Sequence, residues 1–343
     1  MNARLERKLR IYAAIMTAGV IAGVIFSLAN GRSSPAQLIE SAAYGLQICI
    51  AIGGIELFVL DGTLRARLTS LPFTANLLVR STVYAVIISV IQVMQLGDLL
   101  VGGTRDPSLQ SFLSGFIYSA VVAVVMNLGF GIANIIGPRA LLNFITGRYH
   151  YPVEENRFVL FVDIAGSTGL AERLGGLGIH RFLDRTFRLM TLAVVDTHGE
   201  VHDYVGDEII VTWPEELGAV ECRPLRCFMA MRGALAEAAG QFEREFGAAP
   251  TIRGSLHFGK VIIGEIGDVK RAIVFNGDVM NTAARLEEAS RQVDGGFIAS
   301  RAAMERFSSA PPFAVRNLGQ LPIRGRADGI DVLGIDAPLV KPA

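Results

Sequence analysis

Residues 157–164 read RFVLFVDI, an apolar run of strand length that carries Asp163 at its end. The next residues, AGSTGLAERLGG at 165–176, are typical of a turn that enters a helix. Asp163 is therefore expected where a strand gives way to a helix.

The turn after this strand is a candidate anion site. The backbone amides of Ala165, Gly166, Ser167 and Thr168, at a helix N-terminus, could bind a polyphosphate, and the glycine would permit a close approach. Taken alone, the same pattern is also typical of a simple helix cap or turn.

A second aspartate lies in a predicted hairpin. Two short β segments, VHDY at 201–204 and EIIVTW at 208–213, flank Asp207 and place it at the hairpin tip. Carboxylates at the ends of adjacent strands can share two hard cations, because Mg²⁺ prefers carboxylate oxygens and keeps positions open for phosphate oxygens. Asp163 and Asp207 are therefore candidate ligands for two Mg²⁺ or Mn²⁺ ions.

A third segment, FNGDVMNTAARLEE at 275–288, places Asn281 and Arg285 four residues apart on one face of a helix. A guanidinium can neutralise charge on a transferring phosphoryl group, and an amide can orient a sugar hydroxyl or ring oxygen. Arg285 could instead form a surface ion pair with Glu287 or Glu288.

Helices and strands alternate around these three segments. Helices are predicted over 179–197, 216–246 and 278–290, and strands near 251–258, 260–265, 271–275 and 296–299, with a terminal β stretch to about 336. The mixed pattern predicts an α+β domain over 157–336. A polar linker precedes it at 141–156, and a loose tail follows at 337–343.

The first 140 residues have a different composition. Apolar runs recur at 11–29, 44–60, 76–101 and 111–137, each near or above the ~20 residues that cross a bilayer. Residues 1–140 are therefore predicted to form four transmembrane helices in contact with membrane lipid.

Basic residues mark one side of the predicted spans. The loop after the second span and the segment after the fourth contain Arg65, Arg67, Arg139 and Arg148, whereas the other two loops contain only Arg32 and Arg105. Because basic loops stay in the cytoplasm, both termini and the α+β domain are expected on the cytoplasmic side of the inner (plasma) membrane.

Two ionisable residues lie within or near the ends of the spans, Glu56 in the second and Arg80 in the third. They could pair, since an unpaired charge in hydrocarbon costs several kcal/mol. Such a pair could be structural or interfacial, or it could mark a functional site.

The composition of the whole chain limits the possible partners. The 32 basic and 32 acidic side chains balance, so the sequence predicts no nucleic-acid partner. Cys49, Cys222 and Cys227 form no CxxC metal pair and are expected to be reduced and buried.

These segments, in this order and at this spacing, resemble the catalytic domain of the class III adenylate and guanylate cyclases. The resemblance covers about residues 150–336 and rests on FVDIAGST, YVGDEIIVTW, HFGKVIIGEIG and FNGDVMNTAARLEE together. It implies a ferredoxin-like fold in a head-to-tail homodimer, where each site takes its aspartates from one chain and its Asn and Arg from the other. The implied reaction is attack of the ribose 3′ oxygen on the α-phosphate, with pyrophosphate departing.

The resemblance also implies roles for individual residues. Residues at the positions of Asp163 and Asp207 bind two metal ions, with help from the backbone carbonyl of Ile164. The residue at the position of Asn281 holds the ribose, and that at the position of Arg285 holds the α-phosphate in the transition state.

Three further positions bear on the substrate. Arg324, in PIRGR, matches the residue that holds the distal phosphates, although by itself it could be a solvated charge. Adenine-selective members usually carry a lysine at the position of Asp203 and an aspartate or threonine at that of Val274, and neither is present. A carboxylate at 203 could accept hydrogen bonds from guanine, and guanine-selective members carry an acid there. In addition, Ser167 replaces the phenylalanine of the common DI-x-G-F-T run.

The sequence therefore predicts a membrane-bound adenylate cyclase that forms cyclic AMP from ATP for intracellular signalling, with ATP favoured because it is the commoner substrate in the family. A guanylate cyclase that uses GTP is the first alternative, and a catalytically silent nucleotide-binding receptor is the second. The stretch VGDEI superficially resembles the GGDEF loop of diguanylate cyclases, but it lacks the first glycine and would leave the Asn281 and Arg285 helix unexplained.

Overall fold

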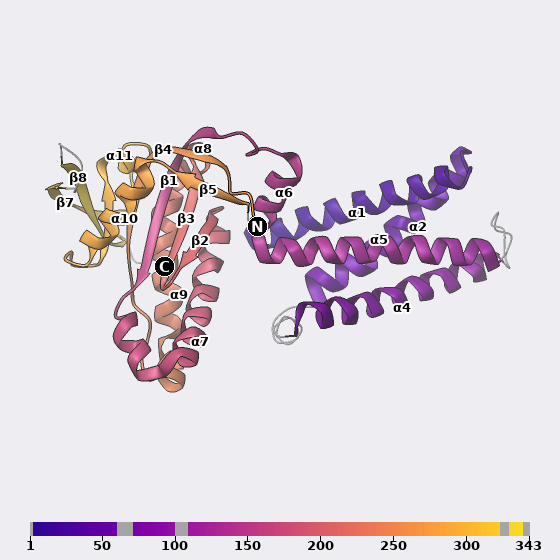
Figure 1. The fold of residues 1–343 in the computed structure, drawn as a ribbon, viewed down its shortest axis with the longest axis horizontal. Coiled ribbons are helices and arrows are strands. Elements are labelled where there is room, and N and C mark those ends of the chain that lie inside the picture. Colours follow the sequence, from indigo (N-terminus) through magenta and orange to yellow (C-terminus); the bar gives the residue numbers. More distant parts are fainter. Residues whose placement is uncertain (1–2, 60–70, 100–108, 270, 323–328, 339–343) are drawn as a thin grey trace. The chain divides into compact units, whose positions relative to one another are not determined.

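The computed structural model describes residues 3–59, 71–99, 109–269, 271–322 and 329–338 (Figure 1). The chain divides into two compact units, Met1–Thr146 and Gly147–Ala343. Four arginines named above lie outside the described residues: Arg65, Arg67, Arg105 and Arg324.

The first unit is helical. Its elements are α1 (Ala3–Ala29), α2 (Pro35–Gly54), a π-helix (Ile55–Val59), α4 (Phe73–Leu99), α5 (Leu109–Ile136) and α6 (Pro138–Thr146). Four stretches are long and apolar enough to cross a membrane: Lys8–Ala29, Pro35–Phe58, Phe73–Met94 and Phe112–Ala133. The four long apolar helices that the sequence predicts are therefore confirmed, and their length and composition would allow them to span a membrane.

The second of these helices begins nine residues before the apolar run predicted at 44–60. The Ser34 hydroxyl accepts a hydrogen bond from the Gln37 amide, and the Gln37 side chain accepts one from the Ser34 amide. Pro35 occupies the first turn, where its missing N–H costs nothing. This capping box starts the helix in a polar stretch that hydropathy alone excludes.

Glu56 and Arg80 form the pair that the sequence suggested. Arg80 Nη1 lies 2.5 Å from Glu56 Oε2, and the Tyr84 hydroxyl donates to Glu56 Oε1 at 2.5 Å. Glu56 and Arg80 therefore neutralise each other, which offsets their loss of hydration.

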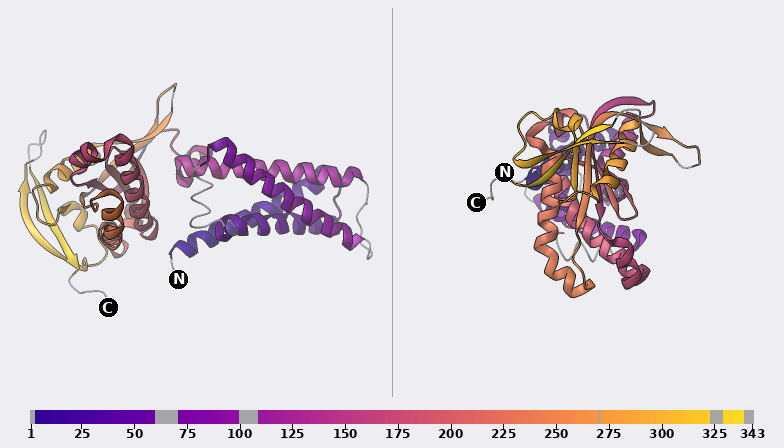
Figure 2. Two further views of the ribbon diagram at one scale, coloured as in Figure 1. Left: turned by 90° about the horizontal axis from the view of Figure 1, so that it is seen from below. Right: turned by 90° about the vertical axis from the view of Figure 1, so that its left-hand side faces the viewer.

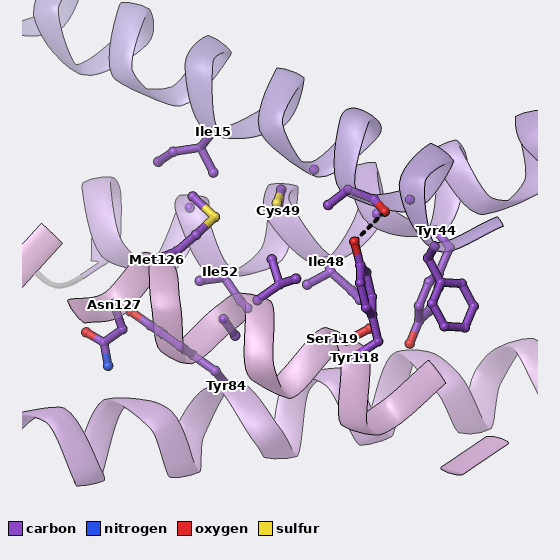
Figure 3. A pocket seen from close by; sticks show the side chains of 18 of the residues that line it. Ile15, Tyr44, Ile48, Cys49, Ile52, Tyr84, Tyr118, Ser119, Met126 and Asn127 are labelled. Carbon is purple, nitrogen blue, oxygen red and sulfur yellow. Dashed lines mark hydrogen bonds between the residues drawn. The ribbon is translucent and has the colours of Figure 1, made fainter. Parts of the chain in front are cut away.

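An apolar pocket lies among the helices of this unit, with about 760 Å³ of empty space, its open mouth included (Figure 3). Figure 3 shows Ile15, Cys49, Tyr84 and Met126 around it, one residue from each of the four long helices. Cys49, like Cys222 and Cys227 in the second unit, is a buried free thiol, as predicted.

The second unit has an α+β fold. Its strands are β1 (Val153–Ile164), β2 (Glu200–Val205), β3 (Glu208–Pro214), β4 (Ile252–Ile266), β5 (Ala272–Asn276), β6 (Phe297–Ser300), β7 (Phe313–Leu321) and β8 (Ile330–Pro338). Its helices are α7 (Ser167–Asp196), α8 (Glu215–Gly218), a 3₁₀ turn (Val220–Cys222), α9 (Arg223–Phe246), α10 (Asp278–Ser290) and α11 (Arg301–Met304). The strands follow the order β2-β3-β1-β4-β6-β8-β7, and β5 pairs with β4.

The two faces of the central strand pack against different helices. Phe158, Leu160 and Val162 face the core under α7 and α9, which lie side by side (Figure 2). Val159 and Phe161 face α10. Because side chains alternate along a strand, Asp163 faces α10 too.

Three of the differences from the predicted boundaries have a cause that is visible in the fold. β4 is one strand instead of two, because it pairs with β1 without interruption from Ile164↔Ile252 to Val153↔Ile263. The predicted helix 216–246 is broken before α9, where Glu221 and Cys222 have φ of 53° and 52°. β1 begins at Val153, inside the predicted linker, because β4 extends far enough to pair with it.

The segment before β1 is attached to this unit. Tyr149 is 3% exposed and packs with Val159 and Val261. Its hydroxyl donates to Glu155 Oε1 at 3.0 Å, and its carbonyl accepts from the Glu265 amide at 3.0 Å. Tyr149 therefore belongs to the core on the α10 side of the sheet.

Candidate active site

A row of charged side chains crosses three strands on the α10 face of the sheet. In the strand register Asp163 lies opposite Glu208 on β3 and opposite Arg253 on β4. Arg253 Nη2 donates to Asp163 Oδ2 at 3.0 Å. Strand pairing thus places a carboxylate and a guanidinium on either side of Asp163.

Asp207 is held next to the end of β1. Gly206 turns the chain with a φ of 64°, and the Ile164 amide donates to the Asp207 carbonyl at 3.3 Å. The Ser167 hydroxyl donates to the Asp207 carboxylate. Burial and, next, the Asp207 carboxylate raise the pKa of Asp163. The structure therefore brings Asp207 close enough to Asp163 to disfavour the charged form of Asp163.

This donor set fits a hard divalent cation. A cation between the two carboxylates would relieve their repulsion, and carboxylate oxygen is the ligand that Mg²⁺ prefers. The Ile164 side chain is 1% exposed in the core, so only its backbone is available to the site. Among the described residues no cluster of three or more His, Cys, Asp or Glu side chains forms a metal site. Two carboxylates would leave positions for water and phosphate oxygens, which suits Mg²⁺.

The turn after β1 presents backbone amides at the start of α7. Gly166 has a φ of 74°, a left-handed conformation that glycine adopts without strain. The Ala165 amide donates to the Thr251 carbonyl at 2.9 Å, so it is already used. Amides in the first turn of a helix have no partner within the helix, which leaves those of Ser167 and Thr168 for an anion.

Asn281 and Arg285 lie on the exposed face of α10. The opposite face is buried, and Ser255 on β4 donates to the Ala283 carbonyl at 2.6 Å. Neither the Asn281 nor the Arg285 side chain has a hydrogen bond or ion pair with any residue the structure describes, so the suggested pairing of Arg285 with a neighbouring glutamate does not form there. In one chain, neither side chain forms a hydrogen bond or ion pair with Asp163 or Asp207.

A family model described as the adenylate and guanylate cyclase catalytic domain matches residues 150–332, more than half of the chain. The chain belongs to this cyclase family.

Named relatives and solved structures agree with this assignment. Adenylate cyclase 2 of Rhizobium meliloti (strain 1021) is 31% identical over 302 residues, which cover 86% of this chain and 83% of that protein. The adenylate cyclase of Anabaena cylindrica is 24% identical over 210 residues, 60% of this chain and 41% of that protein. A bacterial light-regulated adenylyl cyclase has the same fold, with a TM-score of 0.55 at 19% identity over 68% of this chain and 66% of that one.

The similarity to the Rhizobium protein extends into the first unit. The aligned 302 residues exceed the length of the second unit, which runs from Gly147 to Ala343. The chain is thus an enzyme of the cyclase family with apolar helices that could span a membrane.

The candidate site contains charged residues that the sequence did not reveal. Glu287 is 4% exposed, and Arg291 Nη2 lies 3.6 Å from Glu287 Oε2 and 3.9 Å from Asp163 Oδ2. Burial, then Glu287, Asp163 and Asp207, raise the pKa of Glu208 to about 7. Glu208 and Arg253 are placed beside Asp163 by the pairing of the strands. This strand register cannot be read from the sequence, so no sequence signal identifies these residues.

Two strands carry the positions associated with base selection in the family. Asp203 follows a β-bulge in β2, where the register with β3 shifts between Val201 and Asp203. Because of the bulge, Asp203 lies opposite Ile210 and so faces α10, whereas Val201 faces the other side. Val274 lies on β5, opposite Gly264 of β4.

Proposed function

We propose that this cyclase is a membrane-bound adenylate cyclase that converts ATP to 3′,5′-cyclic AMP and pyrophosphate for intracellular signalling. It acts as a head-to-tail homodimer with two Mg²⁺ or Mn²⁺ ions per site, and its catalytic unit and both termini lie in the cytoplasm. The observation that carries the proposal is the pair of carboxylates, Asp163 and Asp207, beside the amides that start α7.

In this mechanism the chain's own residues bind and orient the nucleotide. Cations held by Asp163, Asp207 and the Ile164 carbonyl would supply Lewis-acid activation of the ribose 3′ hydroxyl. Arg253 and Ser167 fix the directions of the two carboxylates through their hydrogen bonds. The amides near Gly166 and Thr168 bind phosphate oxygens, and Arg324 binds the distal phosphates.

The exposed face of α10 supports a site shared between two chains. Asn281 and Arg285 point away from the sheet of their own chain and are free to hold the ribose and α-phosphate at a partner's carboxylates. Apolar side chains are also exposed on β2 and on β4 with the turn that follows it: Tyr204, Val205, Ile262, Ile266 and Val269. A second copy that covers these strands would remove this apolar surface from water.

ATP is the proposed substrate because relatives aligned with most of the chain are adenylate cyclases. GTP is the second candidate, and the observation that favours it is the carboxylate of Asp203 on the α10 face of β2. A carboxylate accepts hydrogen bonds from the N1–H and the N2 amino group of guanine. Adenine has neither of these two donors.

The proposal is tested with the full-length protein in lipid nanodiscs, Mn²⁺ and an equimolar mixture of ATP and GTP, with the products identified by mass spectrometry. We expect cyclic AMP to predominate. Asp207→Asn should lower turnover by about a hundredfold or more, because the metals contribute several kcal/mol to the transition state. Asp294→Asn is the control, since the Asp294 side chain is 99% exposed. Cyclic GMP alone would establish the second candidate, and no cyclic product from either nucleotide would contradict cyclase activity.

A further inference from the structure

Arg157 on β1 is a buried cation outside the proposed site. It is 3% exposed on the α10 face of the sheet, where an unpaired charge would be costly. Its Nε donates to Glu155 at 2.9 Å, and its Nη1 donates to Glu200 at 3.2 Å and to the Thr212 hydroxyl at 2.9 Å. Burial opposes its charge, but Glu200 and Glu155 outweigh burial, and the pKa of Arg157 is raised.

The same guanidinium lies against an aromatic pair. Its central carbon is 5.1 Å from the ring centroid of Phe275 on β5. The His202 ring on β2 stacks on the Phe275 ring, with 4.0 Å between centroids and 26° between planes. Cation–π and ring contacts of this kind each contribute about 0.5–1.5 kcal/mol.

These contacts join two strands that are not neighbours in the sheet. β3, β1 and β4 separate β2 from β5 in the order of hydrogen-bonded strands. Residues Arg157, His202 and Phe275 therefore fix the distance between β2 and β5 where no backbone ladder can do so.

The protonation state of His202 suits this arrangement. Burial lowers its pKa, and Arg157 lowers it further against the opposing effect of Asp203. A neutral imidazole can stack on Phe275 beside the charged guanidinium, whereas two cations against one ring would repel each other.

The two stacked residues, His202 and Phe275, are sequence neighbours of the base-selecting positions. Asp203 follows His202 in β2, and Val274 precedes Phe275 in β5. We propose that Arg157, His202 and Phe275 are positioning residues for base recognition, which hold β2 and β5 at the separation that lets positions 203 and 274 discriminate the purine. This inference rests on the proposed function, because it assumes that these two positions face the base.

Replacing either ring with an aliphatic side chain tests the inference. Steady-state kinetics of Phe275→Leu and His202→Leu would be measured with ATP and with GTP at saturating Mn²⁺. We expect the ratio of the two kcat/KM values to move toward one by about three- to tenfold, the factor that one such ring contact accounts for. KM should rise more than kcat falls, because the metal carboxylates are untouched. His202→Phe keeps a ring at this position and should preserve the ratio.

A matched control separates this effect from general loosening of β2. Phe187 on α7 contacts Tyr204 on the other face of β2, with 5.0 Å between ring centroids, so Phe187→Leu should leave the ratio unchanged. Unchanged ratios in both ring variants, or an equal shift in Phe187→Leu, would overturn the inference. Equal use of ATP and GTP by the wild type would also overturn it, whereas no cyclic product from the wild type would instead contradict the proposed function.

Discussion

The acidic side chains at the end of β1 crowd a small, partly buried space. Asp163, Asp207 and Glu287 each raise the pKa of at least one other acid in this group, Glu208 has its pKa raised by all three, and Arg253 and Arg291 partly compensate these effects. Such an arrangement is stable only with cations present, whether guanidinium groups or metal ions. The same crowding that costs stability thus favours divalent cations at Asp163 and Asp207.

Protonation of His202 should make the stability of the second unit depend on pH. Its pKa in the folded protein lies below the usual 6.5, so below that pH the unfolded chain takes up the proton more readily. The stabilising effect of neutral His202 is complete above about pH 6.5 and is lost as the pH falls through the folded value. We expect His202→Phe to lose less stability than wild type between about pH 7.5 and about pH 5.5.

Fluorescence of Trp213 provides the measurement. It is the single tryptophan of the chain and is fully buried in the second unit, so its emission during thermal unfolding reports on the cyclase unit even in full-length protein. Parallel pH dependence of the melting temperature in wild type and His202→Phe would contradict the prediction.

At the scale of elements, β4 decides where the site residues lie. This strand pairs with β1, β5 and β6, and it carries Arg253 and Ser255. Two of its glycines occupy very different surroundings. A Cβ at Gly254 would lie 2.5 Å from the Phe161 carbonyl oxygen and 3.0 Å from the Phe228 ring, whereas a Cβ at Gly259 would meet only Val279 at 3.4 Å.

Gly254→Ala is therefore expected to destabilise the second unit by about 1–3 kcal/mol, because the backbone of β1 cannot move away without disturbing the strand pairing. It should also lower activity, since Arg253 and Asp163 lie next to the displaced backbone. Gly259→Ala on the same strand should change stability by less than about 1 kcal/mol. Equal melting temperatures for the two variants, followed by Trp213 fluorescence, would argue against this account.

Strands and helices were predicted well where they have regular patterns, and less well where pairing decides them. The apolar runs revealed the core of β1 and the four long apolar helices, but not the capping box before Pro35. The continuity of β4 depends on its partner β1, and the bulge that turns Asp203 depends on β3. These features arise from contacts distant in sequence, which local patterns do not contain.

For the molecule as a whole, the central expectation is that two chains complete each site. Asp207→Ala and Arg285→Ala homodimers should each be nearly inactive, because one lacks a metal ligand and the other lacks the guanidinium at the α-phosphate. A heterodimer of the two variants contains one intact site and should recover up to about half of the wild-type activity. Differently tagged chains, co-expressed and purified over both tags, allow this measurement. No recovery in a verified heterodimer would count against shared sites.

The sequence predicted those residues of the candidate site that lie in recognisable motifs. Asp163 and Asp207 were predicted at neighbouring strand ends, and the structure brings them together. The placement of Asn281 and Arg285 on an outward face follows from which side of α10 packs on the sheet, and this became visible only in the fold. The motifs thus named the participants, and tertiary packing determined which of them one chain can assemble.

The burial of Tyr149 has a practical consequence for isolating the catalytic part of the protein. A truncation that starts at Val153 would remove an aromatic side chain from the α10 side of the core and leave the Glu265 amide without its acceptor. It would also remove two hydrogen-bond donors to Glu155, the Arg148 guanidinium and the Tyr149 hydroxyl. Glu155 is the carboxylate that accepts a hydrogen bond from Arg157. A soluble fragment should therefore begin no later than Gly147, so that it keeps the short segment that fastens β1 to β4.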